Sequence, residues 1–121
     1  MILFDHVQTP HYNYVGDSIL GYYSHMGAGS ITSNVKADKE LVIVNNVRGC
    51  GTPDGEPEMI ETGIKKFGAM LGDHVEIGCN AVLNPGTVVG RNTNVYPTSC
   101  VRGVVPESSI FKNSGEIIKK K

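Results

Sequence analysis

The sequence predicts an all-β chain folded as a single-stranded parallel β-helix, and three observations lead to this fold class. Aliphatic residues recur at every sixth position, small residues stand two positions before most of them, and glycine follows several of them. The aliphatic series is Leu71, Ile77, Leu83, Val89, Val95 and Val101. A period of six fits neither an α-helix nor an isolated strand, whereas stacked coils of short strands repeat each class of residue once per strand. An ordinary sheet of short strands is the alternative. We expect the glycines at the corners, where some positions favour a positive φ.

The first eight residues begin with an apolar stretch, Met1–Phe4, and have no polar cap. An uncovered first coil exposes strand edges and core. We therefore expect either a cover over this coil or that the chain is the C-terminal part of a longer protein. Residues 11–34 hold a looser run of the same repeat, in which Leu20 and Met26 keep the six-residue step. Val15 stands five positions before Leu20, which predicts one short corner.

The repeat is interrupted between residues 35 and 64. Residues 41–47 are apolar and β-branched, residues 49–57 form a cluster of glycine and proline, and residues 58–64 can return as a second strand. This pattern predicts a hairpin-like arm of about 30 residues, which either serves binding or is a loop without a role. The expected organisation is a β-helix domain over 1–112, with the arm at 35–64, followed by a basic C-terminal tail at 113–121.

Composition sets bounds on the function. The 121 residues suffice for one domain, and a net charge of -1 gives no global attraction to nucleic acid. No apolar run approaches the roughly 18 residues that span a bilayer, so we expect no membrane partner. The three cysteines lack the spacing of a metal site, and the simplest setting for them is a reducing, cytoplasmic one.

Three motifs give the chain a resemblance to a known family. They are His-Tyr-Asn-Tyr-Val-Gly-Asp at 11–17, Gly-Ala-Gly-Ser-Ile-Thr-Ser-Asn at 27–34 and Lys-Lys-Phe-Gly-Ala-Met-Leu-Gly-Asp at 65–73. In their order and spacing they resemble the C-terminal acetyltransferase domain of the bacterial bifunctional N-acetylglucosamine-1-phosphate uridyltransferase. The resemblance covers most of the chain except the arm and the tail.

This resemblance implies a left-handed β-helix of triangular section that assembles as a homotrimer, although crossovers between parallel strands are generally right-handed. It also implies a site between subunits, where an acetyl group moves from the co-substrate acetyl-CoA to the amine of a sugar phosphate, glucosamine 1-phosphate. The reaction belongs to the synthesis of UDP-N-acetylglucosamine, a nucleotide sugar. The family's nucleotidyltransferase domain has no counterpart among these 121 residues.

The resemblance assigns roles to individual residues. His11 matches the general base, and an imidazole can accept a proton near neutral pH; a corner histidine without catalytic function is the alternative. Tyr14 and Asn34 match residues that bind the sugar phosphate, and Lys66 matches a lysine that binds its phosphate. Ala28 matches a contact to acetyl-CoA made through the backbone.

Several positions depart from the family pattern. Cys79 stands where the family has a serine that contacts acetyl-CoA, and a thiol is the weaker hydrogen-bond donor. Pro97 replaces a small residue near the CoA end of the site. His25 replaces an asparagine, and Val35 replaces a tyrosine. The expected site therefore retains its base and part of its sugar-binding set, with an altered acyl end.

Two alternatives remain open at the level of the sequence. The departures favour a non-catalytic, trimerising or regulatory β-helix domain of a nucleotidyltransferase. A more remote alternative is a γ-class carbonic anhydrase, because the four residues between His6 and His11 match the spacing of two zinc ligands in that class. The third ligand of such a site is not evident, so we assign no metal-binding residue.

Overall fold

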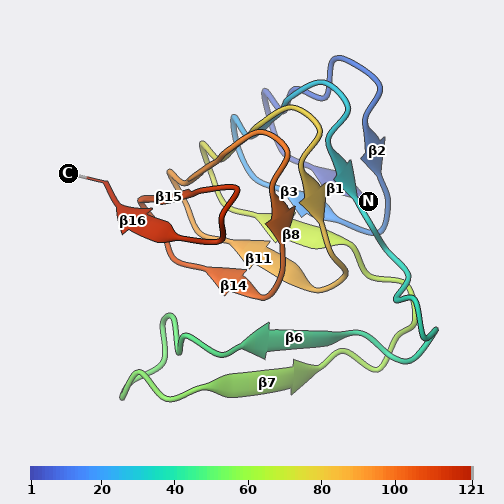
Figure 1. Ribbon diagram of the computed structural model, residues 1–121. Helices are drawn as coiled ribbons and strands as arrows, with labels where there is room; N and C mark the ends of the chain where they lie inside the picture. The colour runs from blue at the N-terminus through green and yellow to red at the C-terminus, as the bar shows by residue number, and fades with distance from the viewer. Residues whose placement is uncertain (121) are drawn as a thin grey trace.

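The computed structural model describes residues 1–120 as short strands and turns, with no helix among them; Lys121, the last residue of the expected tail, lies outside this range. Within these residues no helix is long and apolar enough to cross a membrane. The strands form three sheets along the three sides of a helix of stacked coils, with a separate two-stranded hairpin beside them (Figure 1).

The three sheets are named A, B and C in the order in which the chain visits them within one coil. Sheet A contains β1 (Ile2–Leu3), β3 (Ile19–Leu20), β8 (Ala69–Leu71), β11 (Thr87–Val89) and β14 (Val104–Val105). Sheet B contains β4 (His25–Met26), β9 (Glu76–Ile77), β12 (Asn94–Val95), β15 (Ser109–Phe111) and β16 (Ile117–Lys119). Sheet C contains β2 (Tyr14–Val15), β5 (Ile31–Thr32), β10 (Val82–Leu83) and β13 (Cys100–Val101). Neighbouring strands are parallel except at the C-terminal end, where β16 turns back antiparallel to β15.

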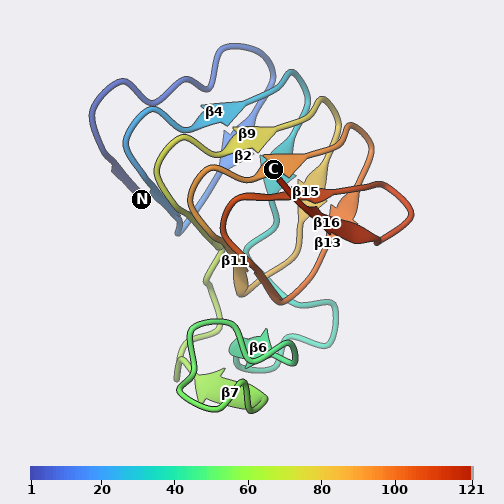
Figure 2. The same ribbon diagram turned by 90° about the vertical axis from the view of Figure 1, so that its left-hand side faces the viewer.

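The coil is left-handed. In Figure 2 the C-terminal end faces the viewer, and the chain runs clockwise through sheets B, C and A as it approaches. A clockwise path toward the viewer describes a left-handed turn. The fold class predicted from the sequence, a left-handed parallel β-helix with one long loop excursion, is therefore confirmed.

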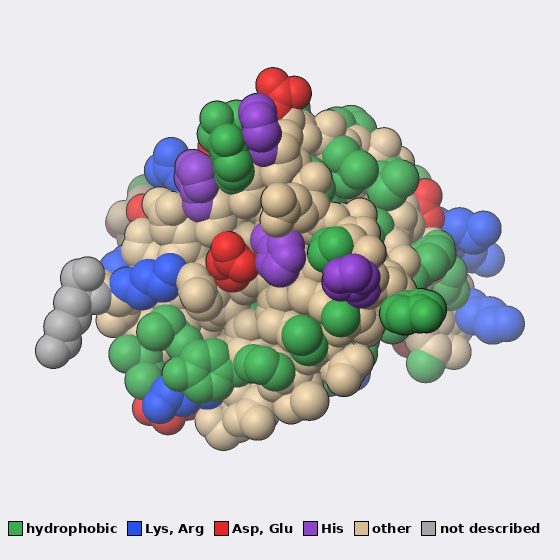
Figure 3. All heavy atoms as spheres, turned by 90° about the horizontal axis from the view of Figure 1, so that it is seen from above, with side chains coloured by type: hydrophobic (Ala, Val, Ile, Leu, Met, Phe, Trp, Pro, Cys, Tyr) green, Lys and Arg blue, Asp and Glu red, His purple; other side chains and the backbone are tan. Residues whose placement is uncertain are grey.

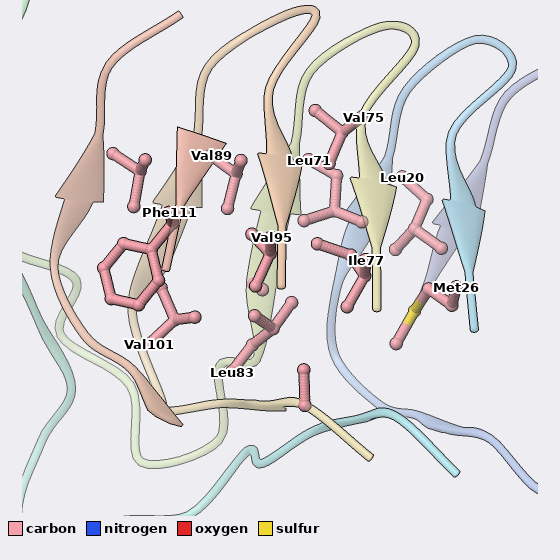
Figure 4. Packing of buried hydrophobic residues seen from close by; sticks show 13 residues of the cluster. Leu20, Met26, Leu71, Val75, Ile77, Leu83, Val89, Val95, Val101 and Phe111 are labelled. Atoms are coloured by element: carbon pink, nitrogen blue, oxygen red, sulfur yellow. The ribbon is translucent and has the colours of Figure 1, made fainter. Parts of the chain in front are cut away.

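The core is the column of inward side chains that the six-residue period predicts. All six aliphatic residues of the series from Leu71 to Val101 are buried, and Leu20, Met26, Val105 and Phe111 extend the column in both directions (Figure 4). The register stacks like upon like, so that Leu83 pairs with Val101 of the following coil. One inner position of the column is polar, because Thr32 pairs with Leu83 and is 0% exposed.

Thr32 is accommodated by hydrogen bonds at the predicted short corner between Val15 and Leu20. The backbone N–H of Gly16 donates to Thr32 Oγ1 at 3.1 Å, and Ser18 Oγ lies 3.0 Å from the same oxygen. Ser18 Oγ also donates to the Gly16 carbonyl at 2.8 Å. The buried hydroxyls therefore satisfy one another, which removes most of the penalty for a polar core position.

The glycines of the repeat serve close packing, which differs from the corner role that the sequence suggests. The positive φ values of regular corners belong largely to other residues, among them Tyr23 at 57° and His74 at 59°. Gly27 and Gly78 instead lie directly beneath the next coil. A Cβ on Gly27 would stand 2.8 Å from the backbone nitrogen of Cys79, and one on Gly78 would collide with the backbone of Pro97.

Residues 35–64 form the arm, a β-hairpin of β6 (Ile43–Asn46) and β7 (Glu58–Glu61) that lies beside the coils (Figure 1). The side chains of Val42 and Val44 are buried beneath it. Its backbone approaches two corner glycines closely, because a Cβ on Gly86 or Gly103 would lie 2.7 Å from a carbonyl oxygen of β6. Arg48 Nη1 also donates to the Val104 carbonyl at 2.7 Å. The arm is therefore docked on the coils.

Candidate functional site

Four of the predicted site residues form one column along the corner between sheets B and C. His11, Ala28, Cys79 and Pro97 occupy the same corner position in successive coils, as the register of β4, β9 and β12 requires. Backbone hydrogen bonds of 3.0, 2.9 and 2.9 Å join the coils at this corner, from Gly29 to His11, from Asn80 to Ala28 and from Thr98 to Cys79. The predicted base and the predicted acyl contacts are thus aligned along the helix axis.

A shallow groove of about 320 Å³ runs beside the lower part of this column. Cys79, Tyr96 and Pro97 line one part of it, and the outward face of sheet B lines the other. His25 belongs to that face, where its Nδ1 lies 3.1 Å from Glu76 Oε2. Because the preceding residues, Gly27 and Gly78, have no side chain, the groove floor is backbone, which suits an extended ligand lying along the column.

The loop that carries His11 is fixed by an asparagine that the sequence analysis did not single out. Asn13 Nδ2 donates to the carbonyls of Gly27, at 2.8 Å, and Ser30, at 3.1 Å, on the next coil. Its Oδ1 accepts the backbone N–H of His11 at 3.2 Å. Asn13 lies inside the first motif, so a search for amides that can bridge stacked coils would have found it. It positions the backbone of His11 and leaves the imidazole exposed.

Tyr14 and Asn34, which the resemblance assigns to the same ligand, are in contact with each other. Asn34 Nδ2 donates to Tyr14 Oη at 3.0 Å and to Asp17 Oδ2 at 2.7 Å. The ring of Tyr14 lies over Gly16, where a Cβ would collide with it. This contact explains the glycine of the first motif. The hydrogen bond from Asn34 adds Asp17 to the group of Tyr14 and Asn34. Tyr14 remains 50% exposed, so part of the residue is accessible to a ligand.

Lys66 lies at the base of the arm, next to this group. Val35 and Lys66 form an antiparallel bridge, and the backbone N–H of Phe67 donates to the Asn34 carbonyl at 2.9 Å. Lys66 is exposed. The predicted residues therefore fall into two sets. The first is the column, at the corner where the strands of sheet C begin, and the second is Tyr14 on sheet C with Asn34 and Lys66 near the corner where its strands end. A hydrogen bond joins Tyr14 to Asn34 in the second set, and the backbone hydrogen bonds between coils stack the residues of the column.

All four histidines belong to sheet B or to the two corners that bound it, and histidine side chains gather on the face shown in Figure 3. His6 stacks on Tyr23 with ring centroids 4.5 Å apart, and Tyr23 stacks on His74 at 5.6 Å. Tyr22 packs edge-on against Tyr23 in the same cluster. Desolvation raises the pKa of Tyr22 above its ordinary value, and the nearby Tyr23 and Asp5 add to this increase through their charges.

His6 and His11 lie at different corners of the first coil, so the spacing that suggests a carbonic anhydrase does not bring them side by side at one corner. Across residues 1–120, no group of three or more His, Cys, Asp and Glu side chains could hold a metal ion.

The fold and the column define a class, the left-handed β-helix proteins built from hexapeptide repeats. No family model matches the chain. It is 34% identical over 121 residues to the bifunctional protein GlmU of Methanococcus vannielii, which covers 99% of this chain and 27% of that protein. It is 32% identical over 111 residues to the bifunctional sugar-1-phosphate nucleotidylyltransferase/acetyltransferase of Sulfurisphaera tokodaii, which covers 92% of this chain and 25% of that protein. The chain thus resembles these bifunctional proteins along its whole length and spans about a quarter of theirs, which confirms the resemblance carried by the motifs.

Solved structures share the fold at lower identity. Serine acetyltransferase 1 of Entamoeba histolytica, in complex with L-cysteine, superposes with a TM-score of 0.64 at 17% identity, over 90% of this chain and 35% of that one. A serine-to-cysteine mutant of AntD, an N-acyltransferase from Bacillus cereus, gives 0.61 at 17% identity, over 95% of this chain and 59% of that one. The AntD structure contains dTDP-4-amino-4,6-dideoxyglucose and coenzyme A.

Proposed function

We propose that this chain is an acetyltransferase domain that moves an acetyl group from acetyl-CoA to the amine of an amino-sugar phosphate. The alignment of His11 with Ala28, Cys79 and Pro97 in one column is the observation that carries the proposal. Relatives named as acetyltransferases and CoA-bound neighbours of the same fold support it. The free cysteines Cys50, Cys79 and Cys100 suit a cytoplasmic setting.

In the proposed reaction the amine nitrogen attacks the carbonyl carbon of the thioester. The imidazole of His11 takes the proton that the nitrogen loses, the carbon–sulfur bond breaks, and CoA leaves as a thiolate that receives a proton. A pantetheine chain lying along the column would bring its thioester toward His11, because the column ends at that residue. The thiol of Cys79, one of the column residues, is a weak donor to the acyl oxygen.

In this proposal the second set of residues, Tyr14, Asn34 and Lys66, binds the acceptor, and we call it the acceptor set. The hydroxyl of Tyr14 and the amide of Asn34 can hydrogen-bond the sugar, and their mutual contact at 3.0 Å fixes both orientations. Lys66 supplies a positive charge for the phosphate. Asp17 orients Asn34 from the other side at 2.7 Å, so that the amide carbonyl of Asn34 is directed away from Asp17.

The function is tested by calorimetric titration with acetyl-CoA, followed by an assay of transfer to glucosamine 1-phosphate. We expect micromolar binding and release of free CoA only when an amine acceptor is present. If the chain forms a trimer but does not bind acetyl-CoA at millimolar ligand concentration, the result would instead support a non-catalytic, regulatory β-helix domain. The departures at Cys79, His25 and Val35 are the specific reason to keep that second candidate.

We further propose that the active assembly is a homotrimer. The column lies where the strands of sheet C begin, and the acceptor set extends to where they end, so the column of one subunit can face the acceptor set of another. Light scattering after size exclusion should give a mass of three chains at micromolar concentration. Acetyl transfer by a monomeric protein would contradict a shared site.

A further inference from the structure

A cleft lies between the arm and the coils, apart from the column and from the group of Tyr14 and Asn34. This cleft has a volume of about 670 Å³, which lies within the range of roughly 300 to 1,000 Å³ that is usual for small-molecule sites. One wall is the arm, including Ile43 and Met59, and the other is the corner between sheets C and A, including Pro85 and Arg102.

The cleft is held open by contacts of the arm that do not line it. Val42 and Val44 bury their side chains against the coils, and Arg48 Nη1 donates to the Val104 carbonyl at 2.7 Å. Asn46 accepts the Cys50 N–H and donates to its carbonyl, both at 2.9 Å, which stiffens the end of β6. These contacts fix both walls of the cleft relative to each other.

The side chains of the cleft combine positive charge with apolar surface. Lys36 belongs to the arm and pairs with Asp38 at 3.7 Å, whereas Arg102 belongs to the corner and adds a positive charge to the lining. Arg102 is exposed on the corner. Ile43 and Met59 supply apolar area in the same lining. Such a lining suits a ligand that carries phosphate groups next to a flat ring, because guanidinium binds phosphate and the apolar side chains cover the ring.

The cleft begins where the acceptor set ends. Ser33 and Val35 line it, and they flank Asn34, whose amide contacts Tyr14. Tyr14 and Asn34 belong to the first coils of sheet C and its corner, whereas Arg102 follows β13 at the far end of the same sheet. A sugar held by Tyr14 and Asn34 could thus extend along the corner into the cleft. A sugar with a single phosphate would leave most of its volume unfilled.

From this geometry we propose that the acceptor is a nucleotide-linked amino sugar, with its sugar at Tyr14 and Asn34 and its nucleoside diphosphate in the cleft against Lys36 and Arg102. The proposal rests on the proposed acetyltransferase function and names its substrate class. It differs from the acceptor that the sequence resemblance implies, which carries one phosphate and no nucleoside.

Binding of nucleoside diphosphates tests the cleft without any turnover. Calorimetric titration with UDP, dTDP and GDP is expected to give submillimolar dissociation constants for at least one of them, and weaker binding of inorganic pyrophosphate, which lacks the ring. Arg102→Gln should raise the dissociation constant about tenfold, the usual effect of losing one charged hydrogen bond. Arg91→Gln is the matched control, because Arg91 pairs with Glu107 at another corner and should leave binding unchanged.

The failure of this proposal can be distinguished from the failure of the acetyltransferase function. Absence of binding by all three nucleotides, pyrophosphate binding as tight as theirs, or no effect of Arg102→Gln would each overturn the cleft proposal, even if acetyl-CoA binds and glucosamine 1-phosphate is acetylated. A protein that binds a nucleotide through Arg102 but transfers no acetyl group would overturn the function alone. Under the full proposal, the glucosamine linked to the tightest-binding nucleotide is acetylated with a higher kcat/KM than glucosamine 1-phosphate.

Discussion

Replacing His11 by asparagine is expected to lower kcat for acetyl transfer by about 10²- to 10⁴-fold, the usual contribution of a general base. The amide cannot take the proton that the attacking amine loses. His11 is exposed at a corner, and its loop is fixed through Asn13, so the substitution should leave the fold intact. Steady-state rates at saturating acetyl-CoA, together with an unchanged circular dichroism spectrum, measure this.

The matched control is His74→Asn, at the corner between sheets A and B. His74 stacks on Tyr23 and lies outside the column, and asparagine tolerates its φ of 59°. Transfer rates of this variant should equal those of the unmodified protein. Equal rates for the His11 and His74 variants, both fully active, would remove His11 from the mechanism.

Leu83→Ala is expected to lower the free energy of unfolding by roughly 2 to 5 kcal/mol, the range for a leucine removed from a packed core. Leu83 is 0% exposed and stacks between Thr32 and Val101 in sheet C. Since neighbouring coils are held at a fixed spacing by their backbone ladder, they cannot collapse into the space left behind. Urea unfolding followed by circular dichroism gives the difference.

Leu41→Ala provides the comparison, because Leu41 lies at the start of the arm and is 47% exposed. Its unfolding free energy should stay within about 0.5 kcal/mol of the unmodified value. A Leu83 variant as stable as the Leu41 variant would show that the inner column contributes little to the stability of the coil.

The repeat predicted the parts of the site that depend on phase. Once the six-residue step is fixed, every eighteenth residue of the regular coils returns to the same corner, which places Cys79 beneath Pro97. The stacking of Cys79 and Pro97 was therefore accessible from sequence, whereas the short corner and the arm break the step that would align His11 and Ala28 with them. The resemblance also assigned Tyr14 and Asn34 to the same ligand, although it did not point to the carboxylate of Asp17, which lies 2.7 Å from Asn34 Nδ2. The division into 1–112 and 113–121 stays a prediction, as do the roles of the site residues.

The features that sequence could not give depend on contacts between segments distant along the chain. Periodicity places Gly78 after Ile77 but does not say that the next coil passes directly over it. The docking of the arm depends on Gly86 and Gly103, which look like ordinary turn residues until the carbonyls of β6 are seen beside them. The cleft is a consequence of that docking, so Arg102 carried no signal of its own.

The arm leaves the coil and rejoins it at a single point. The Asn34 carbonyl accepts the N–H of Phe67 at 2.9 Å, and β8 then pairs with β3 in the register that an uninterrupted chain would have. The helix is thus indifferent to the length of what is inserted there. The arm and the scaffold are separable in such a design: one hairpin can be exchanged for a shorter loop or a different arm while the pitch, the phase and the column that begins at His11 remain as they are.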